Sequence, residues 1–356
     1  MINAIIDTEK YFSVDGNYDL ITFTDNLKFD SVLDIGFGGG GTSLYFATKG
    51  KKVTSIGLNV HTYDYPRDLF DEYKIQVFDS DFLNFNSEKK FDALLMSHVL
   101  EHTLNPGLFL EKARNMLNDE GWLFVMVPPY NNYVLGGHVT PGWNIGHLMY
   151  VLMVSGFDIK NGHFIRYGYN ICAFVQKNKT PLPKLRMDYG DLGNTAHLWQ
   201  LPVEDLGSGE CMLGEVEVVN WFGASIDEIN HARELRNSNK QILKLQTSQN
   251  INIFSEESQG KSVCFYGAGI FAQAFTDQFD LSGINIQGFF DKSKDKNGLK
   301  LANHPIYLPE KIRELKPDRL VLTMAKYDRV LPYIIELRKK YNLCFEIFDS
   351  SFNKID

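Results

Sequence analysis

Residues 31–42, which read SVLDIGFGGGGT, constrain the fold of this chain more than any other stretch. Their apolar start predicts a buried strand that ends at Asp34, and the apolar residues 44–47 after it predict a helix. Glycines between a strand and a helix let backbone N–H groups approach a ligand, because glycine lacks a Cβ and tolerates a positive φ. No Gly-Lys-Ser/Thr follows to hold a triphosphate. The spacing favours a nucleoside-type cofactor, with a purely structural tight turn as the alternative.

Three further motifs follow the glycine turn in a fixed order. They are Asp81-Phe82, residues 91–102 (FDALLMSHVLEH) and residues 117–128 (LNDEGWLFVMVP). Together with the turn they resemble a class I S-adenosylmethionine-dependent methyltransferase over roughly residues 28–178. The resemblance implies a Rossmann-like α/β domain with S-adenosylmethionine as its cofactor.

Strand and helix patterns alternate through this half of the chain, which predicts a largely parallel sheet covered on both faces. A helix is expected to start at Asn105-Pro106, a plausible cap and first turn, and to end before Gly121. Ligands of such sheets bind beyond the carboxyl ends of the strands, where the glycine turn is expected. The predicted strands are residues 32–34, 52–58, 75–78, 93–97 and 122–127.

The resemblance implies that the turn holds the methionine and ribose portions of the cofactor, through Asp34, Gly36, Gly38 and Gly40. Asp34 can accept a hydrogen bond from the cofactor ammonium group. Alternatively, its carboxylate only caps the turn. Ser97 and His98, at the end of the fourth predicted strand, are expected to face the cofactor.

Two implied cofactor contacts lie further along. The family's second strand usually ends in an acidic residue that binds the ribose hydroxyls, but Gly57 stands at that position here. Either cofactor binding is weaker, or Asn59 and a backbone group substitute without the strength of a carboxylate. Asp81 matches the position that contacts the adenine amino group, with Phe82 beside the base. The alternative for Asp81 is a cap on a neighbouring helix.

Residues 136–150 fall where the resemblance places a substrate-covering loop, and they contain His138 and His147. An alcohol acceptor must lose its proton, and a histidine with a pKa near neutral suits that task. Both histidines are therefore base candidates, although a histidine that anchors a loop is the commoner case. The pair Glu101-His102 is expected to be structural, and no metal site is expected.

The rest of the chain predicts a connecting region and a second α/β unit. Residues 225–228 form a capping box that opens a helix, residues 212–221 contain a candidate strand, and residues 246–260 suggest a linker. From residue 261 a strand leads into Gly267-Ala-Gly269, and Asp291 follows at close to the roughly 20-residue offset of dinucleotide folds. The expected domains are residues 1–178, 179–259 and 260–356.

This second unit resembles nucleotide-binding-like domains of enzymes that modify sugars for bacterial surface polysaccharides, and the C-terminal part of sugar C-methyltransferases. Those C-methyltransferases also carry an N-terminal cysteine cluster, which this chain lacks. The resemblance therefore favours O-methylation of a sugar or nucleotide sugar. The open alternatives are a bifunctional enzyme with NAD(P) in the second unit, an unliganded scaffold for a homodimer, and a non-catalytic binding protein.

The composition limits the classes of molecule with which this chain is expected to interact. The formal net charge is −8 without a Lys/Arg cluster, which argues against a nucleic-acid partner. The four cysteines lie far apart, as reduced buried residues do rather than zinc ligands. No signal peptide and no apolar run of the roughly 18 residues that span a membrane are seen, so a cytoplasmic protein without a membrane partner is expected.

Overall fold

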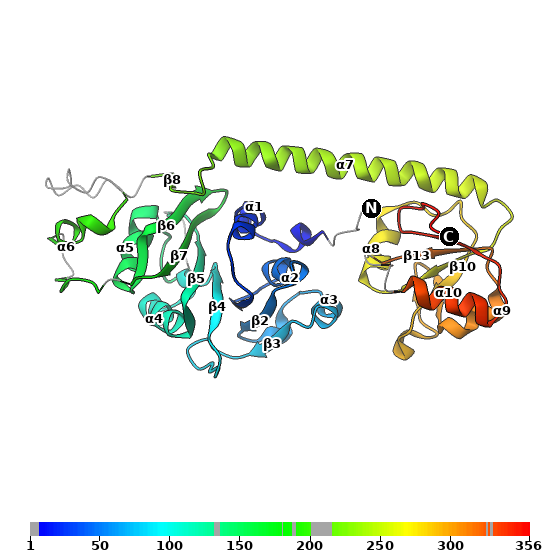
Figure 1. The fold of residues 1–356 in the computed structure, drawn as a ribbon, viewed down its shortest axis with the longest axis horizontal. Helices are drawn as coiled ribbons and strands as arrows, with labels where there is room; N and C mark the ends of the chain where they lie inside the picture. The colour runs from blue at the N-terminus through cyan, green and yellow to red at the C-terminus, as the bar shows by residue number, and fades with distance from the viewer. Residues whose placement is uncertain are drawn as a thin grey trace. The chain divides into compact units, whose positions relative to one another are not determined.

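The computed structural model describes residues 7–131, 136–179, 181–186, 190–200, 216–324, 327 and 330–356, which form two compact units. The N-terminal unit comprises Thr8–Arg233, and the C-terminal unit comprises Glu234–Asp356 with Asp7. This boundary differs from the expected domain borders at residues 178 and 259. It falls inside one long helix, α7 (Ile226–Glu257) (Figure 1).

The N-terminal unit is built on an eight-stranded sheet of order β3-β2-β1-β4-β5-β7-β6-β8. Strands β1 to β5 are mutually parallel, whereas β7 pairs antiparallel with β5 and β6, and β8 pairs antiparallel with β6. The strands are β1 (Ser31–Ile35), β2 (Lys52–Gly57), β3 (Gln76–Asp79), β4 (Phe91–Ser97), β5 (Leu117–Val127), β6 (Phe157–Tyr167), β7 (Asn170–Lys177) and β8 (Val218–Val219). The five parallel strands confirm the predicted ones with shifts at their ends.

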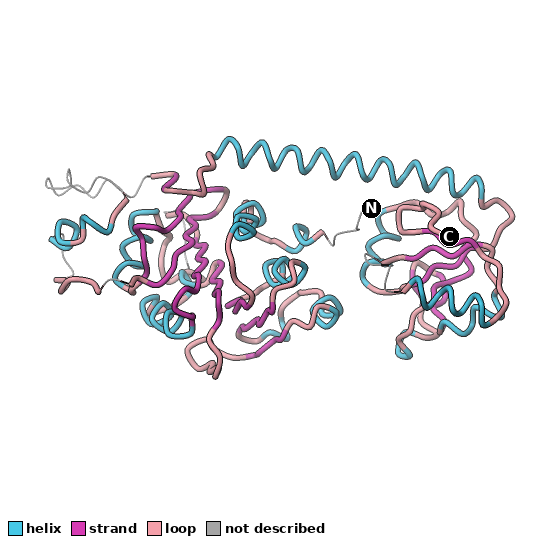
Figure 2. The backbone as a smooth tube through the Cα atoms, viewed as in Figure 1, coloured by secondary structure: helices cyan, strands magenta, loops and turns pink. Residues whose placement is uncertain are grey.

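Helices cover both faces of this sheet (Figure 2). On one face, Leu110 of α4 and Leu148 of α5 join a large aliphatic core. On the other, the ring of Phe46 from α2 stacks on Phe124 of β5. The helices are α1 (Asn17–Ile21), α2 (Gly41–Thr48), α3 (Arg67–Glu72), α4 (Pro106–Met116), α5 (Ile145–Val154) and α6 (Gly190–Asn194), with 3-10 turns η1 (Thr8–Tyr11), η2 (Thr22–Asn26), η3 (Val60–Thr62), η4 (Leu100–His102) and η5 (Ala196–Leu198).

Three local predictions can be compared with these elements. Helix α4 starts with Pro106 at its first position, as predicted, but ends at Met116, because Leu117 already pairs with Phe91 in the sheet. Of the candidate strand at residues 212–221, residues 212–215 lie outside the described residues, and the described part, 216–221, contains the short strand β8. The capping box is confirmed, since Ser225 N donates to Glu228 Oε2 at 2.7 Å and Glu228 N donates to Ser225 Oγ at 3.3 Å.

The linker predicted at residues 246–260 is wrong, because α7 continues to Glu257. Polar residues dominate this stretch, which is why it resembled a linker. Ile251 and Phe254 are nevertheless buried in the core of the C-terminal unit. Burial of these two side chains holds the end of α7 against that unit.

The C-terminal unit contains a six-stranded sheet of order β11-β12-β10-β9-β13-β14, in which β11 alone runs antiparallel to its neighbour. Its elements are β9 (Val263–Tyr266), α8 (Ile270–Gln278), β10 (Ile286–Phe290), η8 (Lys294–Lys296), β11 (Lys300–Leu301), β12 (His304–Tyr307), η9 (Pro309–Lys311), α9 (Ile312–Leu315), β13 (Arg319–Leu322), α10 (Leu331–Lys340) and β14 (Glu346–Phe348). Parallel strands linked by helices agree with the α/β unit predicted from residue 261. Among all described helices, none combines the length and apolarity needed to cross a bilayer.

Candidate functional site

The glycine turn lies between β1 and α2, at the carboxyl edge of the parallel strands, and its predicted glycines serve different purposes. Gly36 and Gly40 have φ of 72° and 81°, and an added Cβ would meet Val99 or the Phe70 ring at 2.7 Å. Gly38 has φ 48°, and the nearest atom to an added Cβ is Gly36 O at 4.0 Å. Close packing therefore requires glycine at positions 36 and 40, whereas open space surrounds Gly38.

A cavity of about 210 Å³ opens beside Gly38. Part of its wall is formed by residues 11–14 and Asn17, which precede the first strand. These residues were not predicted to belong to the site. No motif marks that segment, so only the folded chain reveals it. The lining residues are Tyr11, Phe12, Ser13, Val14, Asn17, Gly36, Phe37, Gly38, Gly39, Gly41, Thr42, Ser97 and His98.

Asn17, which lines this cavity, carries an unpaired acceptor. Its side chain is buried, and its Nδ2 donates to Ser97 Oγ at 3.0 Å. Its Oδ1 is buried without a hydrogen-bond partner. A buried amide oxygen without a partner is costly, so this atom is well suited to accept a hydrogen bond from a bound ligand.

Asp34 does not line the cavity. Its carboxylate is 1% exposed and accepts hydrogen bonds from Thr42 Oγ1 at 2.5 Å and Ser43 Oγ at 2.6 Å. Burial raises the pKa of Asp34 to about 6, although hydrogen bonds from Ser43 and Thr42 oppose the rise. The structure thus places Asp34 in the alternative role considered from the sequence, in which it fixes the start of α2.

The region beyond β2 also lies outside the cavity lining. An added Cβ at Gly57 would meet Tyr63 Oη at 2.8 Å, so the Tyr63 side chain occupies the space beside the missing acidic residue. Asn59 has φ 55°, and its backbone N–H donates to Asp79 Oδ1 at 2.8 Å. A half-exposed carboxylate at the end of β3 therefore sits next to Asn59, and the sequence analysis did not foresee it.

Asp81 and Phe82 take local structural positions. Asp81 Oδ1 accepts a hydrogen bond from Leu83 N at 2.6 Å, which closes a turn. Phe82 is 4% exposed, and its ring packs against Phe109 of α4. Phe82 beside the adenine base stays a prediction, and in the structure α4 packs against its ring.

Ser97 and His98 line the cavity, as the sequence predicted. His98 Nε2 lies 3.0 Å from Asn170 Oδ1, while Asn170 Nδ2 donates to the backbone oxygens of Asp15 and Tyr167. Because that amide nitrogen is already engaged, His98 Nε2 carries the proton and donates to Asn170 Oδ1. The other ring nitrogen, Nδ1, lies 3.3 Å from Glu101 Oε1.

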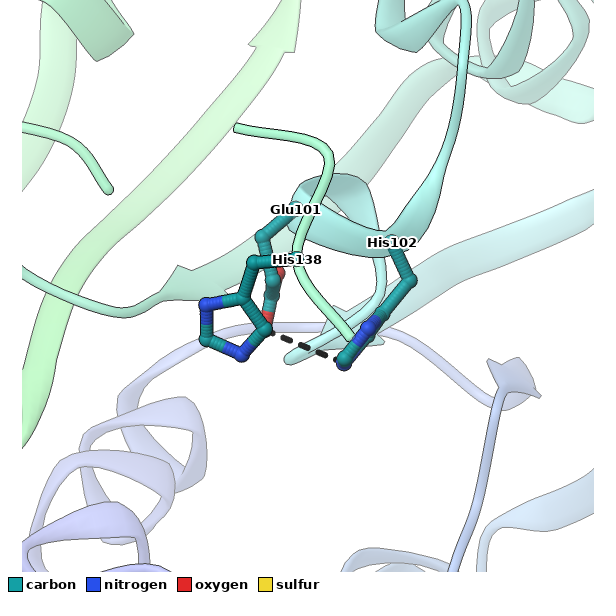
Figure 3. A group of neighbouring side chains, drawn as sticks. All are labelled: Glu101, His102 and His138. Carbon is teal, nitrogen blue, oxygen red and sulfur yellow. Dashed lines mark ion pairs between the residues drawn. The ribbon is translucent and has the colours of Figure 1, made fainter. Parts of the chain in front are cut away.

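Glu101 is fully buried, and neither of its carboxylate oxygens has a hydrogen-bond partner. His102 Nε2 lies 3.8 Å from Oε1 of this carboxylate. The His138 ring joins them, so that one ligand atom from each of Glu101, His102 and His138 lies within 4.8 Å of the others (Figure 3). The expectation of a merely structural Glu101-His102 pair did not anticipate this convergence, because the partner His138 is remote in sequence.

His147 lies apart from the cavity lining. It is on α5, where its backbone N–H donates to Asn144 Oδ1 and its ring stacks on Trp143 at 4.6 Å. Burial against these neighbours lowers the pKa of His147, so its imidazole is neutral at neutral pH. Of the two base candidates, His138 is the one that joins the Glu101 group next to the cavity.

In the C-terminal unit, the carboxylate of Asp291 is engaged by its own chain. Asp291 Oδ2 accepts a hydrogen bond from Ala268 N at 3.0 Å, Oδ1 accepts one from Ser293 N at 2.9 Å, and Lys296 Nζ lies 3.5 Å away. Asp291 therefore ties β10 to the turn after β9. Both carboxylate oxygens of Asp291 thus already accept hydrogen bonds from the protein, and these are the oxygens that would accept from the ribose hydroxyls of a dinucleotide.

Comparisons with known proteins agree on the N-terminal unit. A family model described as a methyltransferase domain matches residues 15–167. The chain is 34% identical over 100 residues to (S)-coclaurine N-methyltransferase of Papaver somniferum, covering 27% of this chain and 28% of that protein. It is 32% identical over 110 residues to ubiquinone biosynthesis O-methyltransferase of Glaesserella parasuis, covering 29% of this chain and 47% of that protein.

The chain thus spans less than half the length of these curated relatives. Among solved structures, 1,6-didemethyltoxoflavin-N1-methyltransferase of Burkholderia thailandensis is 18% identical with a TM-score of 0.38, covering 46% of this chain and 78% of that one. That similarity is too low to support a conclusion about this chain.

Proposed function

We propose that residues 15–167, which match the methyltransferase-domain model, form a class I S-adenosylmethionine-dependent methyltransferase domain, and that this protein transfers the methyl group of S-adenosylmethionine to a small-molecule hydroxyl. The observation that carries the proposal is the cavity beside Gly38, which is lined in part by Asn17, a residue whose buried Oδ1 has no hydrogen-bond partner. The methionine portion would occupy this cavity, with its ammonium group donating to Asn17 Oδ1 in place of Asp34. Open space at Gly38 would let the backbone approach the cofactor.

The acceptor would bind on the His98 side of the cavity. His98 lines the cavity and lies next to Glu101, around which His102 and His138 gather. Methyl transfer is an in-line displacement at the sulfonium carbon, so holding the acceptor oxygen there is the main catalytic contribution. The same polar group would assist removal of the proton from the acceptor hydroxyl. Of the two histidines considered for this role, His138 belongs to the group and His147 does not.

A sugar or nucleotide sugar is the acceptor class that we propose first. The net charge of −8 disfavours a nucleic acid, and the second unit has a mostly parallel sheet of the kind found in nucleotide-binding folds. The relatives include both O- and N-methyltransferases, so the experiment must compare oxygen acceptors with nitrogen acceptors.

The test is transfer of a labelled methyl group from S-adenosylmethionine to matched panels of nucleotide sugars, phenols and amines. We expect labelled product from at least one hydroxyl acceptor and none from the amines. Transfer confined to amines would overturn the hydroxyl assignment. Absence of transfer together with absence of S-adenosylhomocysteine binding would overturn the proposed function as a whole.

A further inference from the structure

We infer that Glu101, His102 and His138 form a site for a divalent first-row transition ion beside the cofactor cavity. The starting point is the Glu101 carboxylate, which has no exposed surface and no hydrogen-bond partner on either oxygen. Burial of a charge without compensation is expensive, so buried carboxylates are paired or bind metals. The donors available to Glu101 are therefore decisive.

The histidine nearest in sequence turns a lone pair, not a proton, toward this carboxylate. His102 Nδ1 lies 2.5 Å from the carbonyl oxygen of Gly137, and because a carbonyl oxygen only accepts, Nδ1 must carry the proton. In the neutral ring, Nε2 is then an acceptor, and it lies 3.8 Å from Glu101 Oε1. Two acceptors that face each other are what a cation between them requires. An outer N–H bonded to a carbonyl is also the usual arrangement of a metal-binding histidine.

His98 repeats this arrangement from the cavity side. Its Nε2 donates to Asn170 Oδ1, which leaves Nδ1 facing Glu101 Oε1 at 3.3 Å. His98 thus connects the Glu101 group to the cavity that it lines. We place it as a neighbour of the site and not as a ligand, because the ligand atoms that converge belong to Glu101, His102 and His138.

His138 supplies the third ligand from the loop. Its Nδ1 is buried without a hydrogen-bond partner. The loop is tied to η4, since Val139 N and Thr140 N both donate to Glu101 O, at 2.6 and 3.2 Å. Gly137, which precedes His138, has φ 74°, a left-handed conformation that favours glycine at this point of the loop.

The ligand types select the ion. Two imidazoles and one carboxylate suit Zn²⁺, Mn²⁺ or Fe²⁺, whereas Mg²⁺ and Ca²⁺ prefer oxygen ligands. Ligand atoms around a tetrahedral zinc ion are separated by roughly 3.4 Å. The 3.8 Å between His102 Nε2 and Glu101 Oε1, and the 4.8 Å limit for the whole group, are close to that spacing. Three protein ligands leave coordination positions open for a substrate.

The consequence for catalysis rests on the proposed function. An acceptor hydroxyl oxygen on the open position of the ion would lose its proton to solvent water more readily, because the ion lowers its pKa. The oxygen lone pair would then form the new C–O bond with the transferred methyl group. The C–S bond would break with its electron pair on sulfur, which leaves S-adenosylhomocysteine. His138 would therefore hold the ion rather than act as a direct base.

The test is calorimetric titration of the full chain, stripped with a chelator, with ZnCl₂, MnCl₂ and MgCl₂ separately. We expect one Zn²⁺ or Mn²⁺ per chain and Mg²⁺ binding at least about 100-fold weaker. Glu101→Gln and His138→Asn should each weaken Zn²⁺ binding about 100-fold, whereas His231→Asn, at an exposed position of α7, should leave it unchanged. If Glu101→Gln does not fold, the loop variant His138→Asn still decides the question.

S-adenosylhomocysteine binding by the same samples separates this inference from the proposed function. Zn²⁺ binding that is absent, or is unaffected by His138→Asn, overturns the metal site even where S-adenosylhomocysteine binds normally. Zn²⁺ binding that requires His138, in a chain that does not bind S-adenosylhomocysteine, supports the metal site and overturns the proposed function.

Discussion

Asn17 Nδ2 donates to Ser97 Oγ at 3.0 Å and joins the segment before the first strand to the end of β4. The bond fixes the side-chain amide of Asn17, a cavity-lining residue whose buried Oδ1 has no hydrogen-bond partner. A short helix ahead of the sheet thus completes the proposed cofactor site. The glycine turn alone does not enclose it.

Asn17→Ala should weaken S-adenosylhomocysteine binding by about tenfold or more, because a hydrogen bond to a charged group contributes roughly 1.5–3 kcal/mol. Isothermal titration calorimetry measures the affinity directly. Asn237→Ala, at an exposed position of α7, is the control and should bind like the parent. Equal affinities of the Asn17 variant and the parent would remove Asn17 from the site.

Gly38→Ala and Gly50→Ala form a matched pair. Both glycines have positive φ, 48° and 81°, and both have open space where a Cβ would lie. Each substitution should cost roughly 1–2 kcal/mol of stability, because alanine is strained in that conformation. Only Gly38→Ala should weaken S-adenosylhomocysteine binding, since only Gly38 lines the cavity. Weakening of equal size in both variants would mean that strain, rather than ligand contact, is being measured.

The pH dependence of stability tests the burial of Asp34. Its pKa is raised to about 6 from the usual 3.8, so the folded state binds this proton more tightly than the unfolded state does. The contribution of Asp34 to the free energy of unfolding is therefore largest below pH 4 and is lost as the pH rises through 6. Two pKa units correspond to about 3 kcal/mol.

Urea unfolding followed by tryptophan fluorescence can measure this contribution, because all four tryptophans lie in the N-terminal unit. The free energy of unfolding of the parent minus that of Asp34→Asn should fall by about 2.4 kcal/mol between pH 4 and pH 7. Other carboxyl groups cancel in the difference. A difference that stays constant with pH would show that Asp34 is not buried as described.

Arg319→Ala tests whether the end of α7 belongs to the C-terminal unit. The Arg319 guanidinium is 4% exposed, bonds Glu346 Oε2 at 3.0 Å and Ser258 Oγ at 2.8 Å, and lies over the Phe254 ring. Its removal leaves Ser258 Oγ and Glu346 Oε2 without this donor, while Lys354 Nζ still pairs with Glu346 Oε1, and should cost about 2 kcal/mol. Arg313→Ala, at an exposed position, should cost little.

The readout for the Arg319 variant is a pair of unfolding curves. Circular dichroism should show an earlier transition, while tryptophan fluorescence, which reports the N-terminal unit only, should not change. A fluorescence transition that shifts as far as the circular dichroism transition would contradict the assignment of Arg319 to the C-terminal unit alone.

The sequence predicted the parallel strands and the glycine turn because each rests on local pattern. Buried strands alternate with amphipathic helices, and the turn between β1 and α2 needs residues without a Cβ. The same local information misjudged residues 246–260, where the burial of Ile251 and Phe254 by other elements outweighs a polar composition. Which face of a polar helix is covered depends on tertiary contacts that periodicity does not specify.

The site was predicted in part. Ser97 and His98 lie at the carboxyl end of a parallel strand, which is the edge of the sheet where ligands bind in such folds. Their position beside the cavity therefore follows from the topology. Asn17 has no motif, and the role of Glu101 depends on His138 from a distant loop, so neither can be derived from spacing. Phe82 looked like a cofactor contact, but the packing of α4 decides its environment.

The central claim is that the cavity beside Gly38 binds S-adenosylmethionine, and calorimetric titration with S-adenosylhomocysteine tests it most directly. The account predicts one saturable site per chain, with binding weakened by Asn17→Ala and by Gly38→Ala but not by Gly50→Ala. A parent protein that shows no saturable binding, or binding that neither cavity variant changes, would contradict it.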